Sequence, residues 1–345
     1  MLNAKKQMMK PGTRIRRVAF SVGVLLCLLL QAGISKAQTD EDAIMMSKNN
    51  FCVGGTYGYS NWDYYWEGTY HRNNLNLGTV STQMVSLMGN YGITDKLNVM
   101  VGAPYIWTHA TAGTLAGQHG IQDLSAWLKY LGLEKNVAKG VLSVYVLGGA
   151  SLPLDNYEPD FLPLSIGLHS KTLSGRLMLD YQKGNFFATV LGTYTWRSDI
   201  TIDQNAYYTT SLHLTNRVDM PNVASEMIRI GYRSDRWIIE ALGTNMNTLG
   251  GFDIRKNDMP FPSNKMNSTM AGAHVKYSFR KVNGLSLNVD GDYTLAGRNV
   301  GQARSFDVGV FYILDFSKKA PKAAGSRPTV RSDIHAHILT NPSTN

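Results

Sequence analysis

A strict alternation of apolar and other residues between Ser305 and Phe316, SFDVGVFYILDF, is the feature that most restricts the fold. Every second residue from Phe306 onward is apolar, and the remaining positions include an aspartate near each end. Side chains of a β-strand alternate between two faces, so the pattern predicts a strand with one apolar and one mixed face. A crossing of about 10 residues of this kind is typical of a transmembrane β-barrel. A half-buried strand of a soluble sandwich looks the same, so the prediction depends on repetition along the chain.

Similar segments recur along the chain and predict an all-β fold, an antiparallel transmembrane barrel of about twelve strands. The expected strands are 51–66, 75–92, 97–109, 120–132, 140–152, 172–182, 186–200, 223–233, 237–249, 267–280, 285–296 and 305–316. Short connections (94–96, 133–139, 183–185, 234–236 and 281–284) alternate with generally longer ones. Bacterial outer-membrane barrels have short periplasmic turns and long extracellular loops. We therefore expect the short connections in the periplasm, and the first strand paired with the last so that no edge faces lipid.

The two ends of the chain carry signals of a different kind. Residues 1–37 read as a secretory signal peptide, with a basic stretch, an apolar core over 18–30, and Ser35-Lys36-Ala37 before the expected cleavage. The alternative, a membrane anchor, needs a longer apolar run. Residues 38–50 are then expected as a periplasmic N-terminal segment, 51–316 as the barrel, and the basic, proline-containing 317–345 as a disordered tail.

Charge and cysteine content exclude several functions. Seven of the 34 Lys and Arg residues lie in residues 1–37, so the remainder is nearly neutral despite the overall charge of +9. No basic surface remains to predict nucleic-acid binding. Cys52 is the only cysteine after residue 37, so no internal disulfide is expected. We expect no cofactor and no metal site, because His335 and His337 on the tail are more simply explained as solvated side chains.

Motifs of common hydrolases do not occur, so the chain is not expected to be an enzyme. The sequence contains neither Gly-x-Ser-x-Gly nor His-Glu-x-x-His. An outer-membrane lipid-modifying enzyme needs a lipid-facing Ser and His close together. His169 and Ser170 are adjacent, fall in an expected loop, and would point to opposite faces of a strand.

Charged residues at the positions that alternate with the apolar face predict a polar interior. In one interpretation they pair across strands, Arg176 with Asp180 for example, and fill a narrow barrel. In the other they line a water-filled path and set solute preference. A barrel of about twelve strands lies between the filled and the open cases, and we expect a narrow, partly occluded channel. The predicted lumen-lining residues are Asp123, Lys129, Arg176, Asp180, Arg197, Arg229, Arg233, Glu240, His274, Lys276, Arg280, Asp290, Asp292 and Asp307.

Three segments resemble a known family over roughly residues 75–316. They are YGITDKL (91–97) running on to APY (103–105), GIQDL (120–124), and LGGASLPLDNY (147–157). Together they are similar to the outer-membrane transporter family associated with phenol meta-pathway degradation operons. Gln122 stands where the family has its second glycine, and Leu154-Asp155-Asn156 replace Thr-Gly-Asp, so the loops on the substrate side differ from the family pattern.

The resemblance implies a channel or transporter in the outer membrane of a Gram-negative bacterium that passes small solutes, hydrophobic or aromatic ones among them. It supplies no catalytic residue. Asp123 is the polar motif residue we single out, with capping of a strand or pairing with Lys129 as structural alternatives. The main alternative function is a structural or surface-interaction barrel that uses loops 62–70 and 201–222. Expected partners are outer-membrane lipid, a small-molecule solute, and the barrel-assembly machinery, because Phe316 resembles the terminal aromatic that this machinery recognises.

Overall fold

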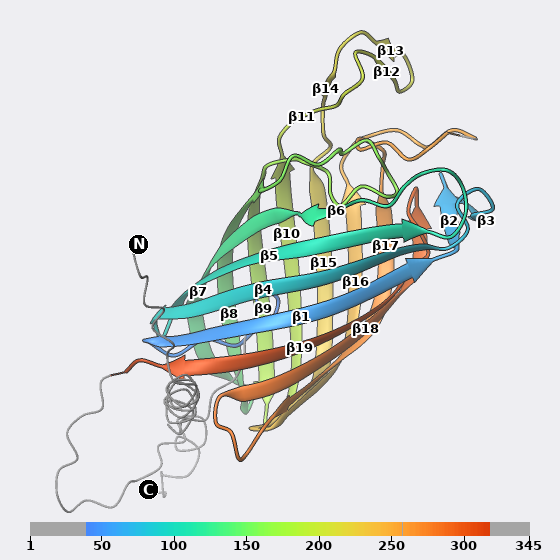
Figure 1. The fold of residues 1–345 in the computed structure, drawn as a ribbon. Coiled ribbons are helices and arrows are strands. Elements are labelled where there is room, and N and C mark those ends of the chain that lie inside the picture. Colours follow the sequence, from blue (N-terminus) through green and yellow to red (C-terminus); the bar gives the residue numbers. More distant parts are fainter. Residues whose placement is uncertain (1–38, 257, 318–345) are drawn as a thin grey trace, which may run out of the picture.

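The computed structural model describes residues 39–256 and 258–317 (Figure 1). Among these residues, no helix is long and apolar enough to cross a membrane. The expected signal peptide, residues 1–37, and nearly all of the expected tail, 317–345, lie outside the described residues. Both therefore stay predictions.

Twelve long antiparallel strands form a closed barrel, as the sequence predicted. β1 (Asn50–Trp62) pairs with β4 (Val80–Thr94) on one side and with β19 (Arg304–Asp315) on the other, which closes the sheet. A closed sheet leaves no unpaired backbone edge in lipid. The remaining long strands are β5 (Leu97–Ala110), β7 (Asp123–Val137), β8 (Gly140–Pro153), β9 (Thr172–Lys183), β10 (Phe186–Arg197), β15 (Val223–Arg233), β16 (Trp237–Thr248), β17 (Asn267–Ser278) and β18 (Leu285–Arg298).

Short turns join the strands at one end of the barrel. The turn between β7 and β8 consists of Ala138 and Lys139, both with positive φ, as tight hairpins require. The sequence placed this connection at 133–139, but β7 continues to Val137. A β-bulge between Leu131 and Leu133 explains the error, because the extra residue shifts the alternation and hides the end of the strand.

Longer connections at the opposite end carry short strands of their own. β2 (Tyr64–Glu67) and β3 (Tyr70–Asn73) form a hairpin directly after β1, so the predicted first strand 51–66 is interrupted at Asp63. β6 (His119–Ile121) adds to β5. The connection after β10 holds β11 (Ile200–Thr201) with β14 (Arg217–Val218), and β12 (Tyr207–Tyr208) with β13 (Leu212–His213). Figure 1 shows this double hairpin projecting beyond the barrel wall.

The two faces of the wall differ as the alternation predicted. On β19, the side chain of Val310 is 52% exposed on the outside, whereas its neighbour Phe311 is 2% exposed and points inward. Outward positions on the other strands are likewise exposed and apolar, including Leu87, Leu177, Val190 and Ile230. An apolar outer surface of this extent is stable against hydrocarbon rather than water.

Candidate functional site: the barrel interior

The N-terminal segment, defined here as residues 39–46, lies inside the barrel. Ala43 and Met46 are 6% and 1% exposed. Ala43 belongs to a buried apolar cluster with Tyr145, and Met46 packs with Phe311 and other inward residues of β1 and β19. The sequence placed residues 38–50 in the periplasm before the first strand. In the structure, residues 39–46 instead occupy the interior that the strands enclose.

Lys129 on β7 is the principal contact of this segment. Its side chain is 0% exposed. The ammonium donates to the carbonyl oxygens of Thr39 at 3.1 Å, Ile44 at 2.9 Å and Asp42, and to Asp42 Oδ1 at 3.2 Å. A buried cation is stable only when it is paired and hydrogen-bonded, and the segment supplies all four acceptors.

Two arginines and a tyrosine extend the contact around the wall. Arg176 Nη1 on β9 donates to the Asp40 carbonyl at 2.9 Å and to Asp40 Oδ2 at 3.0 Å. Arg229 Nη1 on β15 donates to the Glu41 carbonyl at 3.1 Å. The Tyr145 hydroxyl on β8 donates to the Ala43 carbonyl at 2.9 Å. In each of these contacts the wall supplies the donor and the segment supplies the acceptor.

The segment is also folded on itself. Asp42 Oδ2 accepts from the Thr39 backbone N–H at 2.7 Å, and Asp42 Oδ1 accepts from the Ile44 N–H at 3.1 Å. Such local side-chain bonds replace the ladder that a strand would have. The segment is therefore held in the barrel by side-chain contacts and its own turn, and it is not a strand of the barrel sheet.

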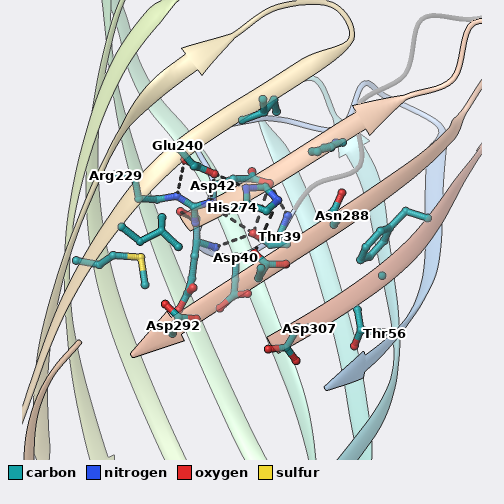
Figure 2. Close-up of a pocket in the computed structure, with 18 of the residues that line it drawn as sticks. Thr39, Asp40, Asp42, Thr56, Arg229, Glu240, His274, Asn288, Asp292 and Asp307 are labelled. Atoms are coloured by element: carbon teal, nitrogen blue, oxygen red, sulfur yellow. Dashed lines mark hydrogen bonds and ion pairs between the residues drawn. The ribbon is translucent and has the colours of Figure 1, made fainter. Parts of the chain in front are cut away.

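A second polar cluster crosses β15, β16 and β17. Arg229 donates to both carboxylate oxygens of Glu240, at 3.0 and 2.5 Å, and His274 Nδ1 lies 2.5 Å from Glu240 Oε1. Strand register explains the grouping, because Glu240 lies opposite His274, and His274 lies opposite Asp290. Figure 2 shows Arg229, Glu240 and His274 converging beside Asp42 of the segment.

A cavity of about 520 Å³ separates the segment from the wall formed by β15 to β19, β1 and β4. Asp290, Asp292 and Asp307 line it, and Asp292 and Asp307 are labelled in Figure 2. Asp290 and Asp307 lie directly opposite each other on β18 and β19. Four methionines add an apolar surface, namely Met84, Met88, Met227 and Met270. The barrel interior is thus partly filled, with space left along one side of the segment.

The residues predicted to line the lumen fall into several places. Eight line this cavity: Arg229, Arg233, Glu240, His274, Lys276, Asp290, Asp292 and Asp307. Lys129 and Arg176 face the segment on the opposite wall. Arg197, at the end of β10, is half-buried. Arg280 lies beyond the end of β17 and is exposed.

Two expected pairings are wrong. Asp180 binds Arg233, with 3.3 Å between Asp180 Oδ2 and Arg233 Nη1, and not Arg176. Arg176 and Asp180 are four residues apart on one strand, which separates their Cα atoms by about 13 Å, and Arg176 reaches Asp40 instead.

Asp123 does not pair with Lys129. It lies at the long-loop end of β7, where it accepts a hydrogen bond of 2.6 Å from the Tyr157 hydroxyl. Burial, reinforced by this hydrogen bond, raises the pKa of Tyr157 above its ordinary value. Tyr157 also accepts from the His169 backbone N–H at 3.0 Å, so it fastens the loop between β8 and β9 to the barrel.

Sequence reasoning missed the acidic residues of the N-terminal segment. Thr39-Asp40-Glu41-Asp42 closely follows the expected cleavage site, and the sequence alone assigns this run only to a periplasmic segment. The available signal was charge complementarity, because several predicted interior positions are basic and lacked an assigned partner.

A closed antiparallel barrel with an apolar exterior and a charged interior defines an outer-membrane β-barrel protein. Its location is the outer membrane. Residues 72–226 match the model of a family described as "Putative MetA-pathway of phenol degradation", which confirms the resemblance carried by the three motifs. Comparison with curated protein sequences finds no match.

Solved structures of outer-membrane proteins align with the chain at low sequence identity. An outer-membrane channel from Pseudomonas putida F1 aligns with a TM-score of 0.63 and 16% identity, over 80% of this chain and 100% of that one. The NanC porin aligns with a TM-score of 0.43 and 10% identity, over 75% and 98%. The translocator domain of the autotransporter NalP from Neisseria meningitidis gives 0.41 and 10%, over 87% and 96%. The first of these shows the barrel fold.

Proposed function

We propose that this barrel is an outer-membrane channel for small solutes, with the N-terminal segment narrowing its interior in the present state. The observation that carries the proposal is the cavity of about 520 Å³ beside that segment. Its volume lies in the range of small-molecule sites, about 300 to 1,000 Å³. The segment is held by hydrogen bonds and ion pairs with wall side chains and by apolar packing of Ala43 and Met46, so it can move without breaking the ladder of the wall.

The solutes that suit this interior are small molecules with an apolar or aromatic part. Methionine side chains are flexible and polarisable, and four of them line the cavity. The match to a family described by phenol degradation supports the same class of solute. Charged groups that line the same cavity keep the path wet and set its preference among such solutes.

Planar-bilayer recordings of the purified full-length protein test the channel. We expect discrete conductance steps, with larger or more frequent steps in a variant that lacks residues 39–46. A variant in which the order of residues 39–46 is scrambled keeps the volume of the segment but removes its specific contacts with the wall, so it distinguishes these two contributions. If neither the wild type nor the deletion conducts, although both migrate as folded barrels in unheated gels, the channel proposal is wrong.

A surface-interaction role is the second candidate. The hairpin of β12 and β13 projects beyond the barrel (Figure 1), and Leu212 and Leu214 within this connection are exposed. Exposed apolar side chains on a projecting loop suit binding to another macromolecule. A folded barrel that shows no conductance but binds another macromolecule through this loop would favour the second candidate.

We infer that the barrel does not act as an enzyme. Ser170 is buried and donates to the Ser198 carbonyl at 2.7 Å, so its hydroxyl does not face lipid beside His169. The solved structure that shares this fold, with a TM-score of 0.63, is described as an outer-membrane channel. Absence of lipid hydrolysis by the sample used for conductance is the expected result.

The remaining partners follow from the outer surface. Outward side chains such as Val310 and Ile230 are exposed and apolar, which supports contact with outer-membrane lipid. Phe316 directly follows β19 and is 60% exposed, which supports its recognition by the barrel-assembly machinery.

A further inference from the structure

We propose that the acidic N-terminal segment occupies a binding site for a small aromatic carboxylate, on the wall formed by β7, β8, β9 and β10. The solute and Asp40 compete for Arg176. The proposal rests on the channel function, because the ligand reaches this wall as a transported solute. It deepens that function by naming the charge and the shape of the solute.

The first observation is the origin of the charges. Within the described residues, the ion pairs of Lys129 and Arg176 are all made with the segment: Asp42 for Lys129, and Asp40 and Glu41 for Arg176. Both cations are almost fully buried. When the segment leaves, these two side chains lose their anions, and a buried cation without an anion is costly. An entering carboxylate restores the pairing.

The second observation is an aromatic surface at the same place. The guanidinium of Arg176 lies 4.5 Å from the ring centre of Trp127. Trp127 lies over Gly149 on β8, where a Cβ atom would come within 2.5 Å of the indole. The absence of a side chain at Gly149 therefore lets one face of the indole lie flat against the wall, while the Arg176 guanidinium lies over its other face.

The third observation is space for a ring beside that indole. A second cavity, of about 250 Å³, is lined by Trp127 and by small or hydroxylated residues of β7 to β10, with Ser174 two residues before Arg176. In strand register the row Trp127–Gly149–Ser174 lies next to the row Lys129–Leu147–Arg176, on the side of the long loops. A solute from outside meets the ring cavity first and the cations next.

These three observations specify an aromatic carboxylate. The ring occupies the cavity and contacts the edge of the Trp127 indole, and edge-to-face aromatic contacts of this kind form at about 4.5–7 Å between ring centres. The carboxylate then accepts from the guanidinium of Arg176, whose planar fork matches a carboxylate. A neutral phenol would fill the ring cavity but would leave the cation unpaired once Asp40 has moved.

Calorimetric binding of benzoate to the full-length protein in detergent tests the site, with Asp40→Asn as the main variant. Asp40 lies outside the strands, so this change leaves the wall intact. Removing the competing carboxylate should tighten benzoate binding about tenfold, the equivalent of about one charge-assisted hydrogen bond. Benzyl alcohol and benzylammonium should gain less than about twofold, because neither replaces the lost negative charge.

Three controls make the result specific. Adding Arg176→Gln to Asp40→Asn should abolish the gain, whereas adding Arg304→Gln, the same charge change in an exposed pair with Asp63, should retain it. In Asp40→Asn, acetate should bind at least about tenfold more weakly than benzoate, because it lacks the ring. If the Arg176→Gln barrel does not assemble, the ligand series in Asp40→Asn alone decides the matter.

Several outcomes would overturn the inference. Unchanged benzoate affinity in Asp40→Asn, an equal gain for benzyl alcohol, or equal binding of acetate and benzoate would each show that the segment does not occupy an aromatic carboxylate site. If the protein conducts in the bilayer and any of these results is obtained, the proposal of a channel stands and only the proposed aromatic carboxylate site is wrong. Absence of conductance in both wild type and the 39–46 deletion removes the channel itself.

Discussion

Replacement of Lys129 by methionine should release the N-terminal segment without altering the wall. Methionine matches the length and the apolar stem of lysine but has no ammonium group. The change removes the donor that contacts the Thr39, Asp42 and Ile44 carbonyls and the Asp42 carboxylate. The Lys129 side chain is 0% exposed.

The size of the effect can be worked from the contacts. An ammonium has three protons, so it makes at most three full hydrogen bonds. Three bonds that involve a charged donor contribute about 4.5 kcal/mol at about 1.5 kcal/mol each. The cost of removing the ammonium from water in the segment-bound state offsets part of this free energy, so the net stabilisation of the bound segment is about 3 kcal/mol. Each 1.4 kcal/mol is tenfold, so the ratio of open to closed states should rise about 100-fold.

Single-channel open probability in a planar bilayer measures that ratio. Lys135→Met is the matched control, because Lys135 lies on the same strand, β7, and is exposed. We expect Lys129→Met to raise the open probability strongly and Lys135→Met to behave as the wild type. Equal open probability in Lys129→Met, Lys135→Met and wild type, in barrels of equal gel mobility, would refute the idea that this side chain holds the segment in a closed state.

Two further predictions concern the wall and an outer loop. Gly54→Val should destabilise the folded barrel by about 1–3 kcal/mol through overpacking, because a Cβ there would lie 2.1 Å from the Phe311 ring. The yield of folded barrel, measured by gel mobility without heating, should fall accordingly. Gly55→Val, where the nearest contact of the Cβ is 3.7 Å away, should assemble normally. Hydrogen bonds from Arg298 lower the pKa of Asp253. The pair therefore stabilises the loop 249–266 fully at pH values above 3.8, the ordinary pKa of the carboxyl group. This stabilisation is lost as the pH falls through the lower pKa of Asp253 in the folded protein. Pepsin should cleave this loop more slowly in the wild type than in Asp253→Asn, and the ratio of the two cleavage rates should approach one as the pH falls through the lowered pKa of Asp253. A ratio that does not change with pH would contradict the role assigned to this pair.

The positions of the long strands could be predicted because alternation is a local property of the chain. β19 was expected at 305–316 and spans Arg304–Asp315, and its pairing with β1 was expected as well. Errors arose where the alternation is broken. The bulge beside Leu131 hid the end of β7, and Asp63 divides an aromatic-rich run into β1 and β2.

The polar interior was harder to predict in detail. The set of inward charges follows from strand parity, but partners depend on register and on what else enters the lumen. Glu240 lies directly opposite His274, and it meets Arg229 diagonally, because Arg229 lies opposite Leu242 on the neighbouring strand. Arg176 meets Asp40, which is 136 residues away in sequence. No local pattern relates two such positions.

The sequence by itself determined the class of fold. Alternating faces, an even set of strands and connections of unequal length are compatible with a closed membrane barrel, because backbone polar groups in lipid must all be paired. Only the tertiary structure decided what fills that barrel. Residues 39–46 have no strand pattern, and their position follows from Lys129, Arg176 and Arg229, which reach them from β7, β9 and β15, because buried cations require anions. The acidic run after the expected cleavage site supplies those anions, so a segment that looks like a simple leader into the first strand becomes part of the interior.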